Sequence, residues 1–211
     1  MRHLRDRQRH DESMNTSSTN GNDATVVHCC FAISGTSNNS WAHDSSTDAP
    51  RCPRCGWITD WTWVERDFKL ERKRFDASVT NDGHLVVSEK FRSLVGEFDV
   101  FQPLPNTAGF YTVIPSFVVR FDEQSVPLRR ERFCNDCERW ESTTTNGVLA
   151  SVVSDPVPEE TGFARTDVEF AWKDRRKPML LISLGVALRL GAEGLKGMSL
   201  MEVPVIPLSS S

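Results

Sequence analysis

The chain has 211 residues, of which 38% are hydrophobic and 26% are charged, and its formal net charge is −4. The composition is that of an ordinary globular protein, and the net negative charge disfavours a general binder of nucleic acid or anionic membrane, because such binders need a basic face. No window approaches the ~18 apolar residues of a membrane span, and the charged N-terminus has no apolar stretch after it. We therefore expect a cytoplasmic protein that is neither secreted nor membrane-spanning.

The N-terminal residues 1–24 are charged and then polar, with too few apolar side chains to offset the entropy lost on ordering. We predict a disordered tail there, followed by a single domain over residues 25–208. The run TVVHCCFAIS has strand composition and is the predicted first strand. A strand directs neighbouring side chains to opposite faces, so Cys29 and Cys30 are not expected to join His28 as ligands. Either cysteine is better interpreted as a small buried hydrophobic residue.

Two Cys-x-x-Cys pairs, Cys52/Cys55 and Cys134/Cys137, are the most informative feature of the chain. Two intervening residues let a tight turn direct both thiolates of a pair to one ion, and zinc takes four such ligands. The long segment between the pairs does not prevent closure, because the entropic cost of a loop grows only logarithmically with its length. The sequence predicts one structural, zinc-ribbon-like Zn²⁺ site, in which four thiolates leave no open position for water or substrate.

The turns of the two pairs differ most consequentially at the residue that follows the second cysteine. In CPRCG, Pro53 presets φ and Gly56 permits the positive φ that the exit of such a turn often needs. In CNDCE the matching position is Glu138, which makes the second turn the weaker match. Two alternatives to a metal stay open: a redox Cys-x-x-Cys, which would need a helix after the first cysteine, and four reduced or disulfide-bonded cysteines.

Period-two alternation of tryptophan with polar residues over Trp57, Trp61 and Trp63 predicts a strand after the first pair. Farther on, residues 85–87 have strand composition and Ser88 is a predicted helix N-cap. The apolar stripe of that short helix is Phe91, Leu94 and Val95.

The C-terminal region repeats this pattern. Residues 180–182 form an apolar run before Ser183, a helical stripe of Val186 and Leu190 follows, and glycines 191, 194 and 197 lead to a predicted strand over residues 198–203. The pattern is that of one strand-helix-strand unit used twice, around a mostly β middle over residues 110–121, or of short apolar runs with a serine cap that align by chance. The predicted fold class is therefore α+β, with mixed strands and two short strand-helix-strand units.

No catalytic group stands out, and we predict that the protein is not an enzyme. The sequence lacks the Gly-x-Ser-x-Gly, P-loop, dinucleotide-binding and His-Glu-x-x-His motifs. His84 follows the turn signal Asn81-Asp82-Gly83, so a solvated turn histidine is the favoured interpretation. The acidic loop at residues 155–160 is interpreted as solvated. The basic clusters at residues 71–74, 129–132 and 173–177 contain acidic residues as well, and we interpret them as solvated charged faces.

The CPRCG motif, the distant second Cys-x-x-Cys pair and the C-terminal stretch LLISLGVALRLGAEGLKGMSLMEV resemble a bacterial family described as double-CxxCG-motif proteins. They also resemble the related immunity proteins of polymorphic toxin systems. The resemblance covers roughly residues 50–205. It implies a cytoplasmic protein that binds and neutralises a cognate toxin, with the four cysteines as structural metal ligands.

Two functions follow from these observations, and an enzyme whose site the known motifs do not reveal is the remaining alternative. The first is a non-enzymatic zinc-binding protein that acts by binding another protein, as an immunity-type factor would. The second is a zinc-ribbon protein that binds nucleic acid through the arginines and tryptophans around the cysteine turns.

Overall fold

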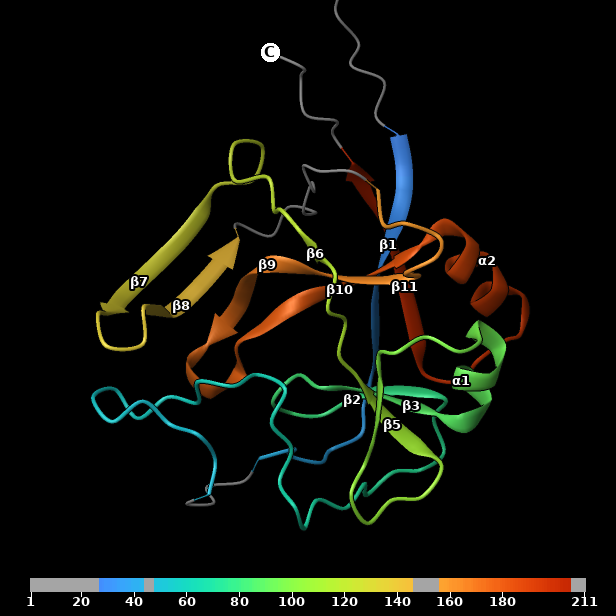
Figure 1. Ribbon diagram of the computed structural model, residues 1–211, viewed down its shortest axis with the longest axis horizontal. Helices are drawn as coiled ribbons and strands as arrows, with labels where there is room; N and C mark the ends of the chain where they lie inside the picture. The colour runs from blue at the N-terminus through green and yellow to red at the C-terminus, as the bar shows by residue number, and fades with distance from the viewer. Residues whose placement is uncertain (1–26, 44–47, 146–155, 206–211) are drawn as a thin grey trace, which may run out of the picture.

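The computed structural model describes residues 27–43, 48–145 and 156–205 (Figure 1). Within these ranges, only the backbone is described at residues 27–29, 171–172 and 174. The predicted tail of residues 1–24 lies outside this range. The fold is a mixed α+β arrangement, mostly strands with two α-helices, as the sequence predicts. Neither helix is long and apolar enough to cross a lipid bilayer.

The strands form one extended, mixed sheet with the order β4-β5-β3-β2-β1-β10-β9-β8-β7, to which β11 and β6 are attached beside β1 and β9. The N-terminal strands are β1 (Val27–Ser37), β2 (Ala77–Val79), β3 (Leu85–Ser88), β4 (Phe101–Pro103), β5 (Phe110–Val113) and β6 (Val118–Val119). The later strands are β7 (Leu128–Cys134), β8 (Arg139–Thr145), β9 (Phe163–Trp172), β10 (Lys177–Ser183) and β11 (Met198–Val205), and a short 3-10 turn η1 (Lys173–Arg175) precedes β10.

The two helices, α1 (Glu89–Val95) and α2 (Leu184–Ala192), begin in the same way. The predicted caps are confirmed, because Ser88 Oγ accepts a hydrogen bond from the backbone N–H of Phe91 and Ser183 Oγ accepts one from Val186, both at 3.3 Å. Each cap is supported by a carboxylate from a distant segment. Ser88 donates to Asp76 at 3.0 Å and Ser183 donates to Glu159 at 2.8 Å.

The strands around the helices also correspond. β3 and β4 lie on either side of β5 and run antiparallel to it. In the same way, β10 and β11 lie on either side of β1 and run antiparallel to it. The helices that join these strands pack against each other on one face of the sheet (Figure 1).

The core follows the period of two along the central strands. Leu85 and Val87 of β3, and Leu180 and Ile182 of β10, point to the helices and join the main apolar cluster with Phe91. The intervening Leu181 of β10 points to the opposite face and packs in a second cluster that includes Cys30. Cys30 is 1% exposed, which confirms its interpretation as a buried hydrophobic residue. The side chains of His28 and Cys29 lie outside the described residues.

The prediction of a strand over Trp57, Trp61 and Trp63 is wrong. Residues 48–76 contain no named helix or strand, and the regular pairing there is one antiparallel bridge between Arg51 and Ile58. The segment follows turns instead, with Thr62 hydrogen-bonded to the Asp60 carboxylate. The three tryptophans are each partly buried against other parts of the fold, so aromatic content in this segment reflects coverage of the core and not strand pairing.

Candidate metal centre

The first cysteine turn is a tight loop closed by backbone hydrogen bonds. The N–H of Gly56 donates to the carbonyl of Cys52, and the N–H of Cys52 donates to the carbonyl of Trp57, both at 2.8 Å. The φ of Gly56 is +75°, as its predicted role requires. This geometry places the thiols of Cys52 and Cys55 on the same side of the loop.

The second cysteine turn joins β7 to β8, a hairpin that projects from the sheet on the side away from the helices (Figure 1). Cys134 is the last residue of β7 and is paired with Arg139, the first residue of β8, so that Cys137 falls within the connecting turn. Glu138 has a φ of +53°, in the left-handed region that Gly56 also occupies. The second turn thus has the same left-handed backbone conformation as the first at this position. A residue with a Cβ adopts this conformation at a free-energy cost that glycine does not have.

The structure brings the two turns together. The Sγ atoms of Cys52 and Cys134 are 3.8 Å apart, those of Cys55 and Cys137 are 3.7 Å apart, and all four lie within 4.8 Å of one another. A tetrahedral ion with metal–sulfur bonds of about 2.3 Å separates its sulfurs by about 3.8 Å, whereas a disulfide bond is about 2.05 Å long. The predicted meeting of the two pairs is confirmed, and their spacing is that of a tetrathiolate metal site.

The protein environment affects the thiols unequally. Burial raises the pKa of Cys55 to about 12, whereas backbone N–H groups of Cys137 and Asp136 lower the pKa of Cys134 to about 7. Four thiolates this close together repel one another, and a divalent cation is the group that relieves this repulsion. The donor set therefore fits a structural metal ion, and its four sulfurs fill a tetrahedral coordination sphere.

Arginines connect the parts of the chain that surround the cysteines. At the exposed edge, Arg54 of the first turn forms an ion pair with Asp136 of the second turn at 3.0 Å. In the interior, Arg176 is 5% exposed, donates to the carbonyl of Trp140 at 2.6 Å and lies 5.4 Å from the centroid of the Trp57 ring. Burial lowers the pKa of Arg176, and the negative charges of Glu169 and the neighbouring thiols oppose that shift. The interpretation of residues 173–177 as a solvated charged face is therefore wrong at Arg176, because the tertiary fold buries this side chain between Trp57 and the carbonyl of Trp140.

An exposed aromatic pair lies beside the second turn. Phe133 and Trp140 are directly opposite each other on β7 and β8, with ring centroids 4.9 Å apart, and they are 47% and 36% exposed. Next to them is an open cavity of about 480 Å³. Its lining combines basic side chains with aromatic ones and includes both sides of the cysteine cluster: Arg54, Cys55, Trp57, Arg132, Phe133, Cys134, Glu141 and Lys173.

The predictions for the other charged residues need two corrections. His84 is not solvated but 4% exposed, because the β2–β3 turn is covered by residues 38–43 and by Lys177, and burial lowers the pKa of His84 to about 3. In the acidic loop, Glu159 is not merely solvated, since it accepts hydrogen bonds from the Ser183 hydroxyl and from the N–H of Gly185 at the start of α2. Asp155 lies outside the described residues.

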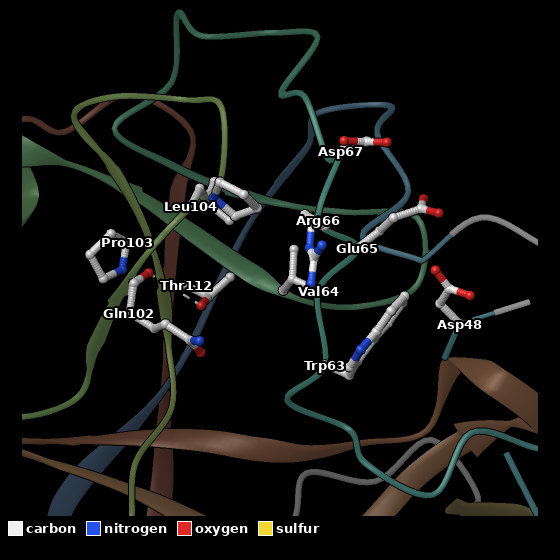
Figure 2. Close-up of a pocket in the computed structure, with 11 residues that line it drawn as sticks. Asp48, Trp63, Val64, Glu65, Arg66, Asp67, Gln102, Pro103, Leu104 and Thr112 are labelled. Carbon is white, nitrogen blue, oxygen red and sulfur yellow. Dashed lines mark hydrogen bonds between the residues drawn. The ribbon is translucent and has the colours of Figure 1, made fainter. Parts of the chain in front are cut away.

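A separate cavity of about 880 Å³ lies between residues 63–67 and residues 102–105 (Figure 2). The carboxylates of Asp48, Glu65 and Asp67 gather at one side of it, and Gln102 lies at the other side. The described residues that line it include Trp63 and Arg66 but no cysteine or histidine, so its lining is more acidic than that of the cavity at the cysteine hairpin and offers no soft metal ligand.

No protein-family model and no curated protein matches the sequence.

The matching positions Gly56 and Glu138 make a first prediction. Glu138→Gly should stabilise the metal-loaded protein by roughly 0.5–1 kcal/mol, because it removes left-handed strain, and Gly56→Ala should destabilise it by roughly 1–2 kcal/mol. No atom lies within 4 Å of a Cβ built on Gly56, so the penalty there is conformational and not steric. Urea denaturation of both variants measures the two free energies of unfolding. Destabilisation by Glu138→Gly would contradict the correspondence of the two turns.

Proposed function

We propose that the protein is a non-enzymatic, zinc-stapled α+β protein that acts by binding another protein in the cytoplasm, as an immunity-type factor that neutralises a cognate toxin. The observation that carries this proposal is the exposed Phe133–Trp140 pair on the hairpin that ends in the cysteine cluster. The resemblance of the sequence to bacterial immunity proteins supports a toxin as the protein partner.

Zinc is the proposed ion because four thiolates in tetrahedral spacing are its usual structural ligand set. The two short turns, each with a Cys-x-x-Cys pair, support a zinc-ribbon-like description of this part of the fold. The corresponding caps and strand positions of the two helices support the proposal that the fold contains two copies of one strand-helix-strand unit. The metal then fixes the hairpin, and the hairpin presents the aromatic pair.

The chemistry of the exposed surface suits a protein partner. Aromatic residues and arginine are the residue types that contribute most to protein interfaces. The cavity beside the aromatic pair also carries Arg54, Arg132 and Lys173. We therefore expect a partner that inserts an apolar side chain against the rings and places acidic groups on the arginines. Arg132 is 75% exposed while it contacts Glu141, so it is open to a second acidic group.

The test is protection in a bacterial host. The toxin-like product of a neighbouring gene is expressed with the wild-type chain, with Phe133→Ala and with Trp140→Ala. Wild type should restore growth, and each variant should weaken binding to the purified toxin by about 10- to 1000-fold, since buried aromatic anchors contribute about 1–4 kcal/mol each. Leu188→Ala is the matched control, because Leu188 is 66% exposed and belongs to α2, which lies on the opposite side of the molecule from the β7–β8 hairpin (Figure 1).

Unchanged metal content and melting temperature in Phe133→Ala and Trp140→Ala would assign any loss of protection to the surface. Full protection by both variants, or no complex between the wild-type chain and the toxin, would count against the proposal.

A second candidate, nucleic-acid binding, is favoured by the same cavity. Bases stack on aromatic rings such as Trp57 and Phe133, while arginines contact the phosphates. The pairing of Arg54 with Asp136 and of Arg132 with Glu141 reduces the positive charge available for this purpose. Affinity for a single-stranded oligonucleotide that falls steeply with salt, and is lost in Trp140→Ala, would favour this candidate over a protein partner.

A further inference from the structure

A second cluster of ligand-type side chains lies away from the four cysteines. It consists of His43, which follows the loop after β1, and of Asp82 and His84 from the turn between β2 and β3. These residues are 4%, 0% and 4% exposed. One ligand atom from each lies within 4.8 Å of the other two. Three ionisable groups this close and this buried are costly to maintain unless a specific interaction compensates them.

The carboxylate of Asp82 is fixed in position. Its Oδ1 accepts a hydrogen bond from the backbone N–H of Ala42 at 3.1 Å, and its Oδ2 accepts one from the N–H of His43 at 3.0 Å. Nε2 of His43 also lies 3.0 Å from Oδ2. The loop that carries His43 is therefore held on the turn that carries Asp82, and the nitrogen and the oxygen are preorganised side by side.

The cluster already holds a cation. Nζ of Lys177 lies 2.8 Å from Nε2 of His84 and donates to the carbonyl of Trp61. An ammonium group only donates, so Nε2 of His84 presents its lone pair, which is the form of imidazole that binds metals. The lysine reaches this position over Gly83, where an added Cβ would lie 2.9 Å from Cγ of Lys177.

We propose that His43, Asp82 and His84 form a second site for a divalent transition metal such as Zn²⁺, and that Lys177 supplies the cation of this site when no metal is bound. Two imidazole nitrogens and one carboxylate oxygen are a ligand set that zinc uses in proteins. Three protein ligands leave the fourth position of a tetrahedral ion to a water molecule. The burial of all three groups suits a structural role, in which the ion holds residues 38–43 on the β2–β3 turn. A metal ion and the lysine ammonium repel each other at this distance, so Lys177 must leave His84 when the ion binds.

The test separates the two sites by their ligands. Metal per chain is measured by elemental analysis for the purified wild type, for Cys134→Ser and for His84→Gln, each dialysed against a low concentration of zinc. We expect about two ions in wild type and about one in His84→Gln, whereas Cys134→Ser should retain at most one, because loss of the ion at the cysteines also destabilises the fold. In the cobalt-loaded protein, Cys134→Ser should lose the intense near-ultraviolet thiolate absorption, whereas His84→Gln should keep it.

Lys177→Met provides the second, independent measurement. It removes the competing charge and leaves the three ligands in place, so it should bind the second equivalent of cobalt at least tenfold more tightly than wild type. This variant decides the question even if His84→Gln fails to fold. A single metal per chain in both wild type and Lys177→Met, lost in Cys134→Ser, would overturn the proposal. The cluster would then be a hydrogen-bonded network whose charge is neutralised by the lysine alone.

Discussion

Removal of the metal from the cysteine cluster should abolish the cooperative thermal transition of the protein. Structural zinc sites contribute roughly 10–16 kcal/mol of binding free energy, which equals or exceeds the roughly 5–15 kcal/mol by which a domain is stable. The dependence should be strong here because residues 48–76 have no named helix or strand of their own. Treatment with a strong chelator, followed by calorimetry and far-ultraviolet circular dichroism, measures the loss.

Substitution of single cysteines sharpens this prediction. Cys134→Ser removes one of the four sulfurs and should lower metal content to well below one equivalent at the cysteine site, with loss of the native transition. Cys30→Ser is the matched control, because Cys30 is also buried, donates to the carbonyl of Val203 and does not belong to the cysteine cluster. It should keep its metal and lose about 1–2 kcal/mol of stability at most. A Cys134→Ser protein that remained folded and fully metal-loaded would refute the shared site.

The cysteine pairs could be predicted to meet because their chemistry is local. A Cys-x-x-Cys turn brings both of its sulfurs to one side whatever the rest of the chain does, and four sulfurs have few alternatives to one shared ion. The two helix starts are equally predictable from the sequence, since a serine before an apolar stripe can accept a hydrogen bond from one of the first free N–H groups of a helix. In both cases the deciding interaction lies within a few residues of the motif.

The predictions that the structure contradicts concern side chains whose surroundings are formed by residues distant in the sequence. Nothing near His84 in the sequence indicates that Lys177 will cover it, and a turn signal such as Asn81-Asp82-Gly83 is normally exposed. The alternation of the tryptophans likewise matched a strand, yet residues 57–63 find no partner strand and cover other parts of the fold by turns. Charge clusters give even less information, because Arg176 is buried while its neighbour Arg175 is exposed.

Arg176, the buried arginine, should strongly affect metal binding at the cysteine cluster. Four thiolates around one divalent cation leave two excess negative charges, and a buried charge must be compensated by a partner. Arg176 is placed to do so, because it lies over Trp57, two residues after Cys55, and holds the carbonyl of Trp140, three residues after Cys137. It also donates to the carbonyl of Lys173 at 3.2 Å.

Arg176→Met should therefore weaken zinc binding at the cysteine cluster by at least about tenfold and destabilise the loaded protein by roughly 3–5 kcal/mol, because it removes the donor to the carbonyls of Trp140 and Lys173 and a buried cation that lies against Trp57. Competition with a chromogenic chelator measures the affinity. Arg176→Lys retains the charge and loses the planar fork, so it should recover part of the metal affinity but less of the stability. Arg54→Met is the control, since Arg54 is exposed beside the same cysteines and its solvent-screened pair with Asp136 contributes little to stability. Equal effects of Arg176→Met and Arg54→Met on zinc affinity would mean that proximity to the cysteines, and not burial of the charge, determines how an arginine supports this site.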